Sequence, residues 1–535
     1  MKYPIGIQDF KSIIEDGYVY IDKTKLIYDL VTNGKTYFLC RPRRFGKSLL
    51  VSTLKYYFLG NSELFRGLAV YGLEKEWAEH PVFHIDFNGE NFTKPGVLEE
   101  MIEGTVAAWE QEYGRDPVQT TIGARFRYVL RRAHEKTGRR AVVLIDEYDK
   151  PILDVLDTGI MGNDSVVTSD NIPQRLEDIH RDLLKGFYSV FKAADQDLRF
   201  VLLTGVTKFS QVSVFSGFNQ PKDISMDARY ESLCGITEEE LHSVFRARIA
   251  EMAVKYRCTE EDMKAMLKKR YDGYHFSEEM KDIYNPFSVL NALDAMKIDD
   301  YWFKTGTPSY LIRLLNHTQE NLNDFTGRYY QEKEFIDYKA DVEMPLPMIY
   351  QSGYLTVKDY APDVNAYKLD FPNDEVKSGF VSLVAANYFK KRTGTDSWVI
   401  NVVMAMRDGD TDAMRDLFTS FLADIPYTMR HKDSEAERER YFHYTIYLIM
   451  RMISCYTVYT EKQNSKGRAD CIVETANDVY IFEFKLDGSA DNALRQIEEK
   501  GYVLPYVSDS RRIHCIGVNF SSKSGTIDEW LEMSK

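Results

Sequence analysis

The stretch from Cys40 to Ser48, with the sequence CRPRRFGKS, constrains the fold of this chain more than any other. It follows a short apolar run, Thr36–Cys40, and it precedes a helix-like run, Leu49–Leu59. A strand, a tight loop and Gly-Lys-Ser at the start of a helix form the context of a phosphate-binding loop. The unpaired N–H groups and the dipole at a helix N-terminus attract an anion. The sequence therefore predicts phosphate binding at this loop.

The expected nucleotide contacts are consecutive residues of this loop: Arg43, Arg44, Phe45, Gly46, Lys47 and Ser48. Lys47 would reach the outer phosphates as a point charge, and Ser48 would place its hydroxyl on a magnesium ion. Arg41 stands where the usual pattern has its first glycine. A distorted loop, or one that uses its arginines to hold phosphate, therefore remains open. The alternative is a basic turn before an ordinary helix.

A second signal lies at the end of the apolar run Ala141–Ile145, where Asp146 and Glu147 follow. Continuous aliphatic residues predict a strand buried on both faces, as in a parallel sheet. At its end, Asp146 would bind the magnesium shell, and Glu147 would orient or deprotonate an attacking water. Many apolar strands end in acidic residues for structural reasons alone. The phosphate loop upstream favours the functional interpretation.

A further predicted strand, Arg199–Gly205, ends near Thr204. Related ATPases place a residue that senses the γ-phosphate at such a position, although a simple strand cap is an equally good interpretation. Strands and helices alternate over residues 36–205, which predicts a doubly wound parallel sheet. Ligands of such sheets bind at the carboxyl ends of the strands, where all of these polar residues lie.

Several runs of the chain together resemble the AAA-ATPase-like family of bacterial proteins. They are Gly6–Phe10, Tyr20–Thr24, Arg41–Ser48, Asp146–Pro151 and Thr204–Ser210. An arginine at the Arg41 position is usual in that family. The resemblance implies a P-loop ATPase core of the AAA kind, which uses ATP and Mg²⁺, with a helical lid from Thr237 onward. AAA-type cores often assemble and complete their sites in trans, so the resemblance is compatible with a homo-oligomer.

The segment Gly467–Lys485 predicts a β-hairpin. If its turn centres on Ala476–Asn477, Asp470 lies directly opposite Glu483, with Cβ atoms about 5 Å apart. Two carboxylates at that distance repel each other unless a cation lies between them. Lys485 follows Glu483 by two residues and shares its face of the hairpin. The pattern predicts a magnesium-binding hydrolytic site. The alternative is a charged pair that faces solvent.

A predicted helix over Ser434–Met452 precedes the hairpin, and its Glu439 lies along the apolar stripe. A charge there is costly without a partner or a metal. A helix Glu, then an Asp, then Glu-x-Lys is similar to the PD-(D/E)xK nuclease superfamily. The site residues that this resemblance implies are Glu439, Asp470, Glu483, Lys485 and, as a supporting residue, Gln496. The three acidic residues would bind the metal, and Lys485 would complete the catalytic set with the two hairpin carboxylates.

Length and composition limit the remaining possibilities. A chain of 535 residues is too long for one core, and we expect an ATPase core over 1–235, a lid and middle region over 236–400, and a nuclease-like domain over 401–535. The net charge of -14 argues against a generally basic nucleic-acid coat but allows a local basic cleft. The 6 cysteines form no Cys-x-x-Cys pair, and no run has the apolar character of a signal or membrane span. These features favour a reducing cytoplasm and no membrane partner.

We therefore expect an α/β protein in which an AAA-type parallel sheet with a helical lid is joined to an α/β restriction-endonuclease-like domain. It would bind and hydrolyse ATP and, with Mg²⁺, cleave phosphodiester bonds in nucleic acid, with DNA favoured over RNA. Two other hypotheses remain open. One is a nucleotide-switched sensor or scaffold whose nuclease-like domain only binds. The other is a phosphotransfer enzyme that acts on a small molecule.

Overall fold

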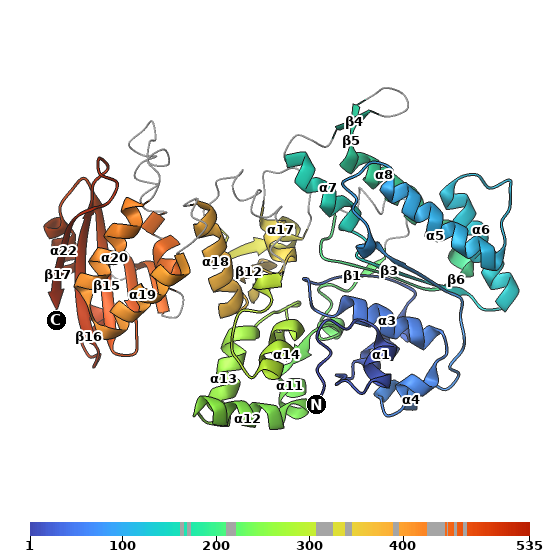
Figure 1. The fold of residues 1–535 in the computed structure, drawn as a ribbon, viewed down its shortest axis with the longest axis horizontal. Helices are drawn as coiled ribbons and strands as arrows, with labels where there is room; N and C mark the ends of the chain where they lie inside the picture. The colour runs from blue at the N-terminus through green and yellow to red at the C-terminus, as the bar shows by residue number, and fades with distance from the viewer. Residues whose placement is uncertain are drawn as a thin grey trace. The chain divides into compact units, whose positions relative to one another are not determined.

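The chain folds into two compact units, Met1–Val376 and Lys377–Lys535. The structure, a computed structural model, describes residues 1–160, 165–167, 173–209, 221–305, 325–336, 345–388, 395–424, 445–446, 448–453, 457–463 and 468–534 (Figure 1). Each unit contains a five-stranded sheet of its own. The expected three-part division, with boundaries after residues 235 and 400, stays a prediction.

The first unit is organised around five parallel strands. In spatial order they are β2 (Val82–Asp86), β3 (Ala141–Asp146), β6 (Leu198–Gly205), β1 (Thr36–Cys40) and β7 (Lys222–Asp223). Strand β6 lies between β1 and β3, so the strand before the phosphate loop and the strand before the acidic pair share one neighbour. The carboxyl ends of all three strands meet at one edge of the sheet. The predicted parallel sheet is confirmed.

Helices cover both faces of this sheet. They are α1 (Phe10–Glu15), α2 (Thr24–Asn33), α3 (Lys47–Phe58), α4 (Ala69–Leu73), α5 (Val97–Tyr113), α6 (Ile122–Thr137), α7 (Lys150–Ile160), α8 (Leu176–Tyr188) and α9 (Val190–Ala193). Figure 1 shows α1, α3 and α4 on one side and α5, α6 and α8 on the other. Every residue of β3 is buried between the two layers, which explains its continuous aliphatic sequence. A short antiparallel pair, β4 (Ser165–Val167) and β5 (Pro173–Arg175), precedes α8.

A helical part follows the sheet. Its elements are β8 (Ile236–Thr237), α11 (Glu238–Val244), α12 (Arg246–Tyr256), α13 (Glu260–Tyr271), β9 (Ile283–Tyr284) and α14 (Pro286–Ala295). Thr237 and Glu240 form a reciprocal capping box at the start of α11. The N-terminal segment belongs to the same core, because Tyr3 stacks on Phe245 with ring centroids 5.8 Å apart. The structure thus contains helices where the sequence predicts the lid.

The end of the first unit contains a small antiparallel sheet in the order β10-β12-β11. Its elements are β10 (Arg328–Gln331), α16 (Glu332–Phe335), α17 (Leu346–Gln351), β11 (Thr356–Ala361) and β12 (Ala366–Asp370). Helix α18 (Asp374–Tyr388) begins in the first unit and ends in the second.

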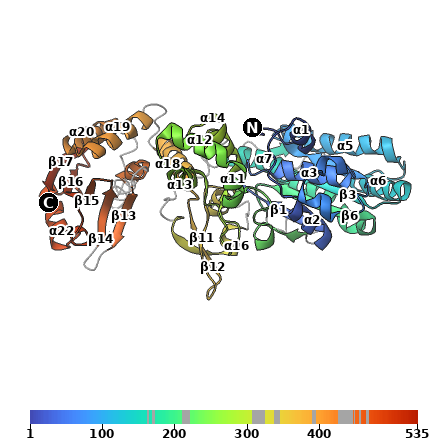
Figure 2. The same cartoon turned by 90° about the horizontal axis from the view of Figure 1, so that it is seen from below.

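The second unit has the strand order β13-β14-β15-β16-β17, in which only the β15–β16 pair is parallel. Its elements are α19 (Thr395–Asp408), α20 (Thr411–Ala423), β13 (Thr457–Gln463), β14 (Arg468–Glu474), β15 (Asp478–Leu486), α22 (Ala490–Glu499), β16 (Arg512–Phe520) and β17 (Ile527–Ser534). Figure 2 shows α19 and α20 on one face of this sheet and α22 on the other. Across the described ranges, no helix combines the length and apolar character needed to cross a membrane.

Candidate functional site

The predicted phosphate loop joins β1 to α3 through two residues with a left-handed backbone. Arg44 has a φ of 69° and Gly46, the N-cap of α3, a φ of 92°. Glycine adopts this conformation without the steric penalty that a side chain adds. Gly46 also has no side chain that could cap the helix. The first N–H groups of α3 therefore remain available to an anion.

Lys47 lies inside this loop, with 3% of its side chain exposed. Its Nζ donates hydrogen bonds to the carbonyl oxygens of Arg41 at 3.1 Å and Pro42 at 3.4 Å. The same Nζ lies 3.6 Å from Oε1 of Glu147. The ammonium is thus held between the loop backbone and the carboxylate that the sequence predicts to act on water. A point charge at this place can neutralise a phosphate bound at the helix start.

The other predicted loop contacts differ in exposure. The Phe45 ring is 1% exposed and packs edge-on against Tyr274, with centroids 4.8 Å apart, so only its backbone can face a nucleotide. Arg43 and Arg44 are exposed, and Ser48 is half-buried in the first turn of α3. These positions leave the two arginines and the serine hydroxyl accessible to a ligand.

The predicted acidic pair and Thr204 meet where β3 and β6 end. Thr204 Oγ1 donates a 2.6 Å hydrogen bond to Oδ1 of Asp146, which is 2% exposed. The backbone N–H of Glu147 donates to the same Oδ1 at 3.1 Å, and a φ of 51° turns Glu147 toward Lys47. The backbone N–H of Tyr148 donates to the Thr204 carbonyl at 3.0 Å. The structure thus brings Lys47, Asp146, Glu147 and Thr204 to one edge of the sheet.

A further acid of this loop, Asp149, was missed by the sequence reasoning. Its Oδ2 accepts hydrogen bonds from the backbone N–H groups of Val206 and Thr207 at 3.0 and 2.6 Å, and from the Thr207 hydroxyl at 2.7 Å. Burial, together with the charge of Glu147, raises the pKa of Asp149 to about 6. The available signal was its place three residues after Asp146 in a strand-end loop. Asp149 binds the end of β6 to the acidic loop.

In the second unit, the hairpin has the register that the sequence predicts. Cys471 pairs with Phe482 at the end of the ladder between β14 and β15 that lies away from the turn. Continuing this alignment by one residue places Asp470 opposite Glu483. Oδ2 of Asp470 accepts a 2.8 Å hydrogen bond from the backbone N–H of Phe484. The Glu483 side chain is 2% exposed, and its Oε2 has no hydrogen-bond partner within the described ranges. A buried carboxylate oxygen without a partner fits a bound cation.

Lys485 completes this cluster. Its Nζ lies 3.3 Å from Oε1 of Glu483 and donates a 2.7 Å hydrogen bond to Oε1 of Gln496 on α22. Burial, and then the charge of Asp470, raises the pKa of Glu483 to about 7, although Lys485 opposes this shift. Gln496 therefore directs the lysine, and the α22 side of the sheet gathers two carboxylates, one ammonium and one amide.

The third predicted carboxylate, Glu439, lies outside the described residues. In the part of the chain that the structure describes, no group of three or more His, Cys, Asp or Glu side chains forms a metal cluster. Of the predicted nuclease site, the described residues therefore provide the Asp470–Glu483 pair and Lys485. A helix residue such as Glu439 would supply the third carboxylate, as the superfamily resemblance implies.

Two family models match the chain. Residues 4–215 match the model described as a predicted AAA-ATPase, and residues 437–530 match the PD-(D/E)XK nuclease superfamily. A protein of Azotobacter chroococcum mcd 1, named as an uncharacterized protein in the vnfD 5′ region, is 35% identical over 533 residues, which cover 98% of each chain. The chain belongs to the AAA-ATPase-like family. Its C-terminal domain is of the PD-(D/E)XK nuclease superfamily.

The matched ranges of this AAA-ATPase-like protein contain the two sites. The first match includes the phosphate loop, the acidic pair and Thr204, and the second includes Glu439, Asp470, Glu483, Lys485 and Gln496. The Azotobacter relative also spans residues 216–436 between the two matches, because its alignment covers nearly the whole chain. The two predicted resemblances are therefore confirmed at the level of the family, and the roles of single residues remain proposals.

Proposed function

We propose that this AAA-ATPase-like protein is a magnesium-dependent nuclease whose N-terminal module binds and hydrolyses ATP. One observation carries the nuclease proposal: Glu483 is buried opposite Asp470 with an oxygen that has no partner within the described residues. A buried carboxylate beside a second carboxylate is unfavourable unless a cation or a proton compensates the charge. Asp470 and Glu483 would hold a magnesium ion, which would supply a bound water of lowered pKa and neutralise charge at phosphorus.

The roles in the nuclease site follow from the contacts. Asp470 and Glu483, with Glu439, would hold the metal ion through their oxygens. Lys485 would position the attacking water or neutralise the charge that develops on the phosphate, since its ammonium lies beside Glu483. Gln496 would keep that ammonium in place through its 2.7 Å hydrogen bond. The substrate class is nucleic acid, and DNA is preferred to RNA.

The roles in the ATP site rest on the shared edge of the first sheet. The N–H groups at the start of α3 and the Lys47 ammonium would bind the phosphates of ATP. Ser48 and Asp146 would hold the accompanying magnesium ion. Glu147 would orient or deprotonate the attacking water, and Thr204 would sense the terminal phosphate through its bond to Asp146.

The ATPase assignment is tested with two variants of the full chain. Lys47→Ala should lose MgATP binding, whereas Glu147→Gln should bind MgATP and lose its hydrolysis, because only the latter keeps the phosphate-binding charge. Titration with MgATP and steady-state phosphate release measure the two steps separately. Wild-type turnover in both variants would refute the assignment.

We also propose how the nuclease is controlled, how the protein assembles and in which compartment it acts. Nucleotide state would control the access of nucleic acid to the nuclease site, and the ATPase modules of several copies would assemble into a homo-oligomer. The scattered cysteines favour a reducing compartment, the cytoplasm. Comparison of cleavage with ATP, with ADP and without nucleotide tests the coupling.

A second candidate is a nucleotide-switched sensor or scaffold whose nuclease-like domain only binds. The net charge of -14 favours it, since a processive or tightly binding nuclease gains from a broadly basic surface. Salt-dependent DNA binding with no cleavage in Mg²⁺ or Mn²⁺ would support the scaffold. Cleavage that depends on the hairpin carboxylates would exclude it.

A further inference from the structure

Arg41 takes the place of the first glycine of the general phosphate-loop pattern, and its side chain is 1% exposed. The guanidinium does not point toward the helix start. Its Nη1 donates to the carbonyl oxygens of Cys40 at 2.9 Å and Ser225 at 2.7 Å. Its Nη2 donates to the carbonyl oxygens of Tyr230 and Glu231, each at 3.4 Å. Four backbone carbonyls therefore surround this buried cation.

An aromatic ring completes the environment of Arg41. The Arg41 guanidinium carbon lies 4.0 Å from the centroid of the Phe276 ring, a distance at which a cation is attracted by the ring face. Phe276 also contacts the ring of Phe45, with centroids 5.4 Å apart. The carbonyl oxygen of Phe45 in turn accepts a 3.1 Å hydrogen bond from Gly235 N–H. Both ends of the phosphate loop are thus hydrogen-bonded to the segment that follows β7, the last strand of the sheet in sequence.

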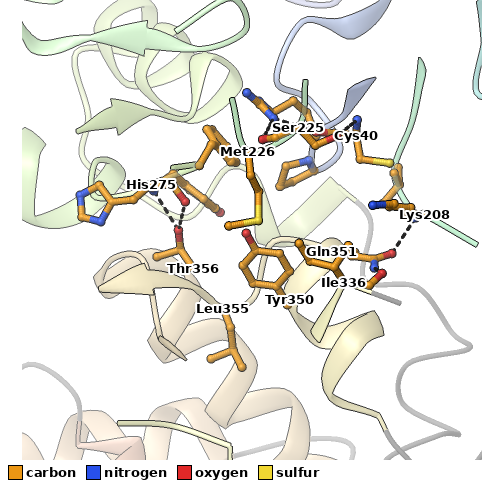
Figure 3. A pocket seen from close by; sticks show the side chains of 15 residues that line it. Cys40, Lys208, Ser225, Met226, His275, Ile336, Tyr350, Gln351, Leu355 and Thr356 are labelled. Atoms are coloured by element: carbon orange, nitrogen blue, oxygen red, sulfur yellow. Dashed lines mark hydrogen bonds between the residues drawn. The ribbon is translucent and has the colours of Figure 1, made fainter. Parts of the chain in front are cut away.

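We call Arg41, the four carbonyl groups that it binds and the Phe276 ring the Arg41 clamp. A small cavity borders this clamp. It has a volume of about 40 Å³ and is lined by Arg41, Phe276 and Ser225 among others. Figure 3 shows Ser225, His275 and Thr356 around it. The volume corresponds to a very few water molecules, far less than a nucleotide needs. The guanidinium beside this cavity donates to carbonyl oxygens of the protein backbone.

We propose that Arg41 is a positioning residue. It sets the conformation of the phosphate loop, the role that the first glycine has in the general pattern. It fixes the loop by binding it to Ser225–Glu231 and to Phe276, so that ATP affinity depends on these downstream segments. The inference rests on the proposed binding of ATP. Arg41 itself makes no phosphate contact, because its two terminal nitrogens donate to carbonyl oxygens and its side chain is inaccessible. Exposed Arg43 and Arg44 are the arginines of this loop that can approach a ligand.

The decisive substitution is Arg41→Gly, which restores the general loop pattern. If the loop needs only the backbone freedom of a glycine at this position, the Arg41→Gly variant would bind MgATP at least as well as the wild type. The clamp predicts the opposite: the Kd and KM for MgATP rise about tenfold or more, and kcat at saturating ATP changes much less. Arg41→Lys should resemble Arg41→Gly, since an ammonium cannot reach two carbonyl groups on each side as the planar fork does. Arg66→Gly, which removes an exposed arginine, is the matched control.

Chemical rescue separates positioning from general destabilisation. Millimolar guanidinium should lower the KM of Arg41→Gly toward the wild-type value, since the ion can occupy the vacated place among the carbonyls. It should not rescue Lys47→Ala, in which the clamp is intact. If Arg41→Gly does not fold, as judged by circular dichroism, Phe276→Leu removes the ring that contacts both Arg41 and Phe45 and should raise the KM about threefold.

The outcomes distinguish this inference from the function on which it rests. Wild-type affinity for MgATP in folded Arg41→Gly, or an unchanged KM in Phe276→Leu where the glycine variant fails to fold, would overturn the clamp and leave the ATPase proposal standing. A wild type that binds no MgATP would overturn both. A raised KM that guanidinium restores would establish the clamp.

Discussion

Thr204 Oγ1 donates a 2.6 Å hydrogen bond to Asp146 Oδ1, and this bond joins the ends of two neighbouring strands of the first sheet, β6 and β3. Both side chains are buried, at 0% and 2% exposure, so water does not compete for the bond. Its acceptor is the carboxylate proposed to hold magnesium, and its donor lies near the end of β6, which pairs with the strand before the phosphate loop. The bond thus links the metal ligand to the segment proposed to sense the terminal phosphate.

Thr204→Val keeps the shape of the side chain and removes the hydroxyl donor. We expect kcat for ATP hydrolysis to fall about ten- to a hundredfold, because a buried hydrogen bond to a charged acceptor contributes about 1.5–3 kcal/mol. The Kd for MgATP should change much less, since the loop and Lys47 are untouched. Phosphate release and MgATP titration measure the two effects. Thr204→Ser, which restores the hydroxyl, is the control, and equal turnover in the valine and serine variants would contradict the prediction.

Magnesium should stabilise the second unit through the Asp470–Glu483 pair. An ion that binds only the folded state at a concentration a hundred times its Kd adds about 2.7 kcal/mol to the free energy of unfolding. Thermal melting of the full chain with and without Mg²⁺, in the absence of nucleotide, should show a rise in Tm that Glu483→Gln abolishes. Glu499→Gln, which neutralises an exposed carboxylate of α22, should keep the rise. A rise of equal size in Glu483→Gln would place the ion elsewhere.

Asp272, at the end of α13, should make the stability of the first unit depend on pH. Its side chain is 1% exposed, and burial raises its pKa to about 7. The unfolded carboxyl loses its proton near pH 4, whereas the folded one keeps it to about pH 7. The free energy of unfolding should therefore fall as the pH rises from 4 to 7 and stay at its lowest above that, with a total change of at most about 4 kcal/mol from this group.

Asp272→Asn removes the charge and should raise the Tm at pH 8 above that of the wild type, with no comparable gain at pH 4. Urea melts at several pH values provide the profile. Asp182→Asn, at an exposed position of α8, shows what an ordinary surface aspartate contributes. A variant with the same pH dependence as the wild type would show that Asp272 is ionised in the folded protein.

The parts of this structure that follow local rules could be predicted from the sequence. The aliphatic run Ala141–Ile145 specifies a strand buried on both faces, and the acidic residues after it lie at the ligand edge of a parallel sheet. The turn over Thr475–Asp478 fixes the hairpin register, which sets Asp470 opposite Glu483. In both cases the spacing along the chain alone determines which side chains meet.

The parts that depend on distant segments could not be predicted in this way. Arg41 binds carbonyl groups more than 180 residues away, so its sequence position gave no indication that it serves the backbone and not a phosphate. Asp149 resembles an ordinary loop acid until β6 brings Thr207 beside it. Glu439 could be placed only by its helical spacing, and it lies outside the described residues.

The central claim is that the hairpin carboxylates and Lys485 hydrolyse phosphodiester bonds, and cleavage itself tests it most directly. Linear, supercoiled and single-stranded DNA, and RNA, are incubated with the wild type and with Lys485→Ala in Mg²⁺ or Mn²⁺, with and without ATP. Lys523→Ala, at an exposed lysine of the same unit, is the matched control. We predict metal-dependent cleavage that the control keeps and Lys485→Ala loses about a hundredfold. Equal cleavage by Lys485→Ala, or no cleavage of any substrate by a wild type that hydrolyses ATP, would contradict the account.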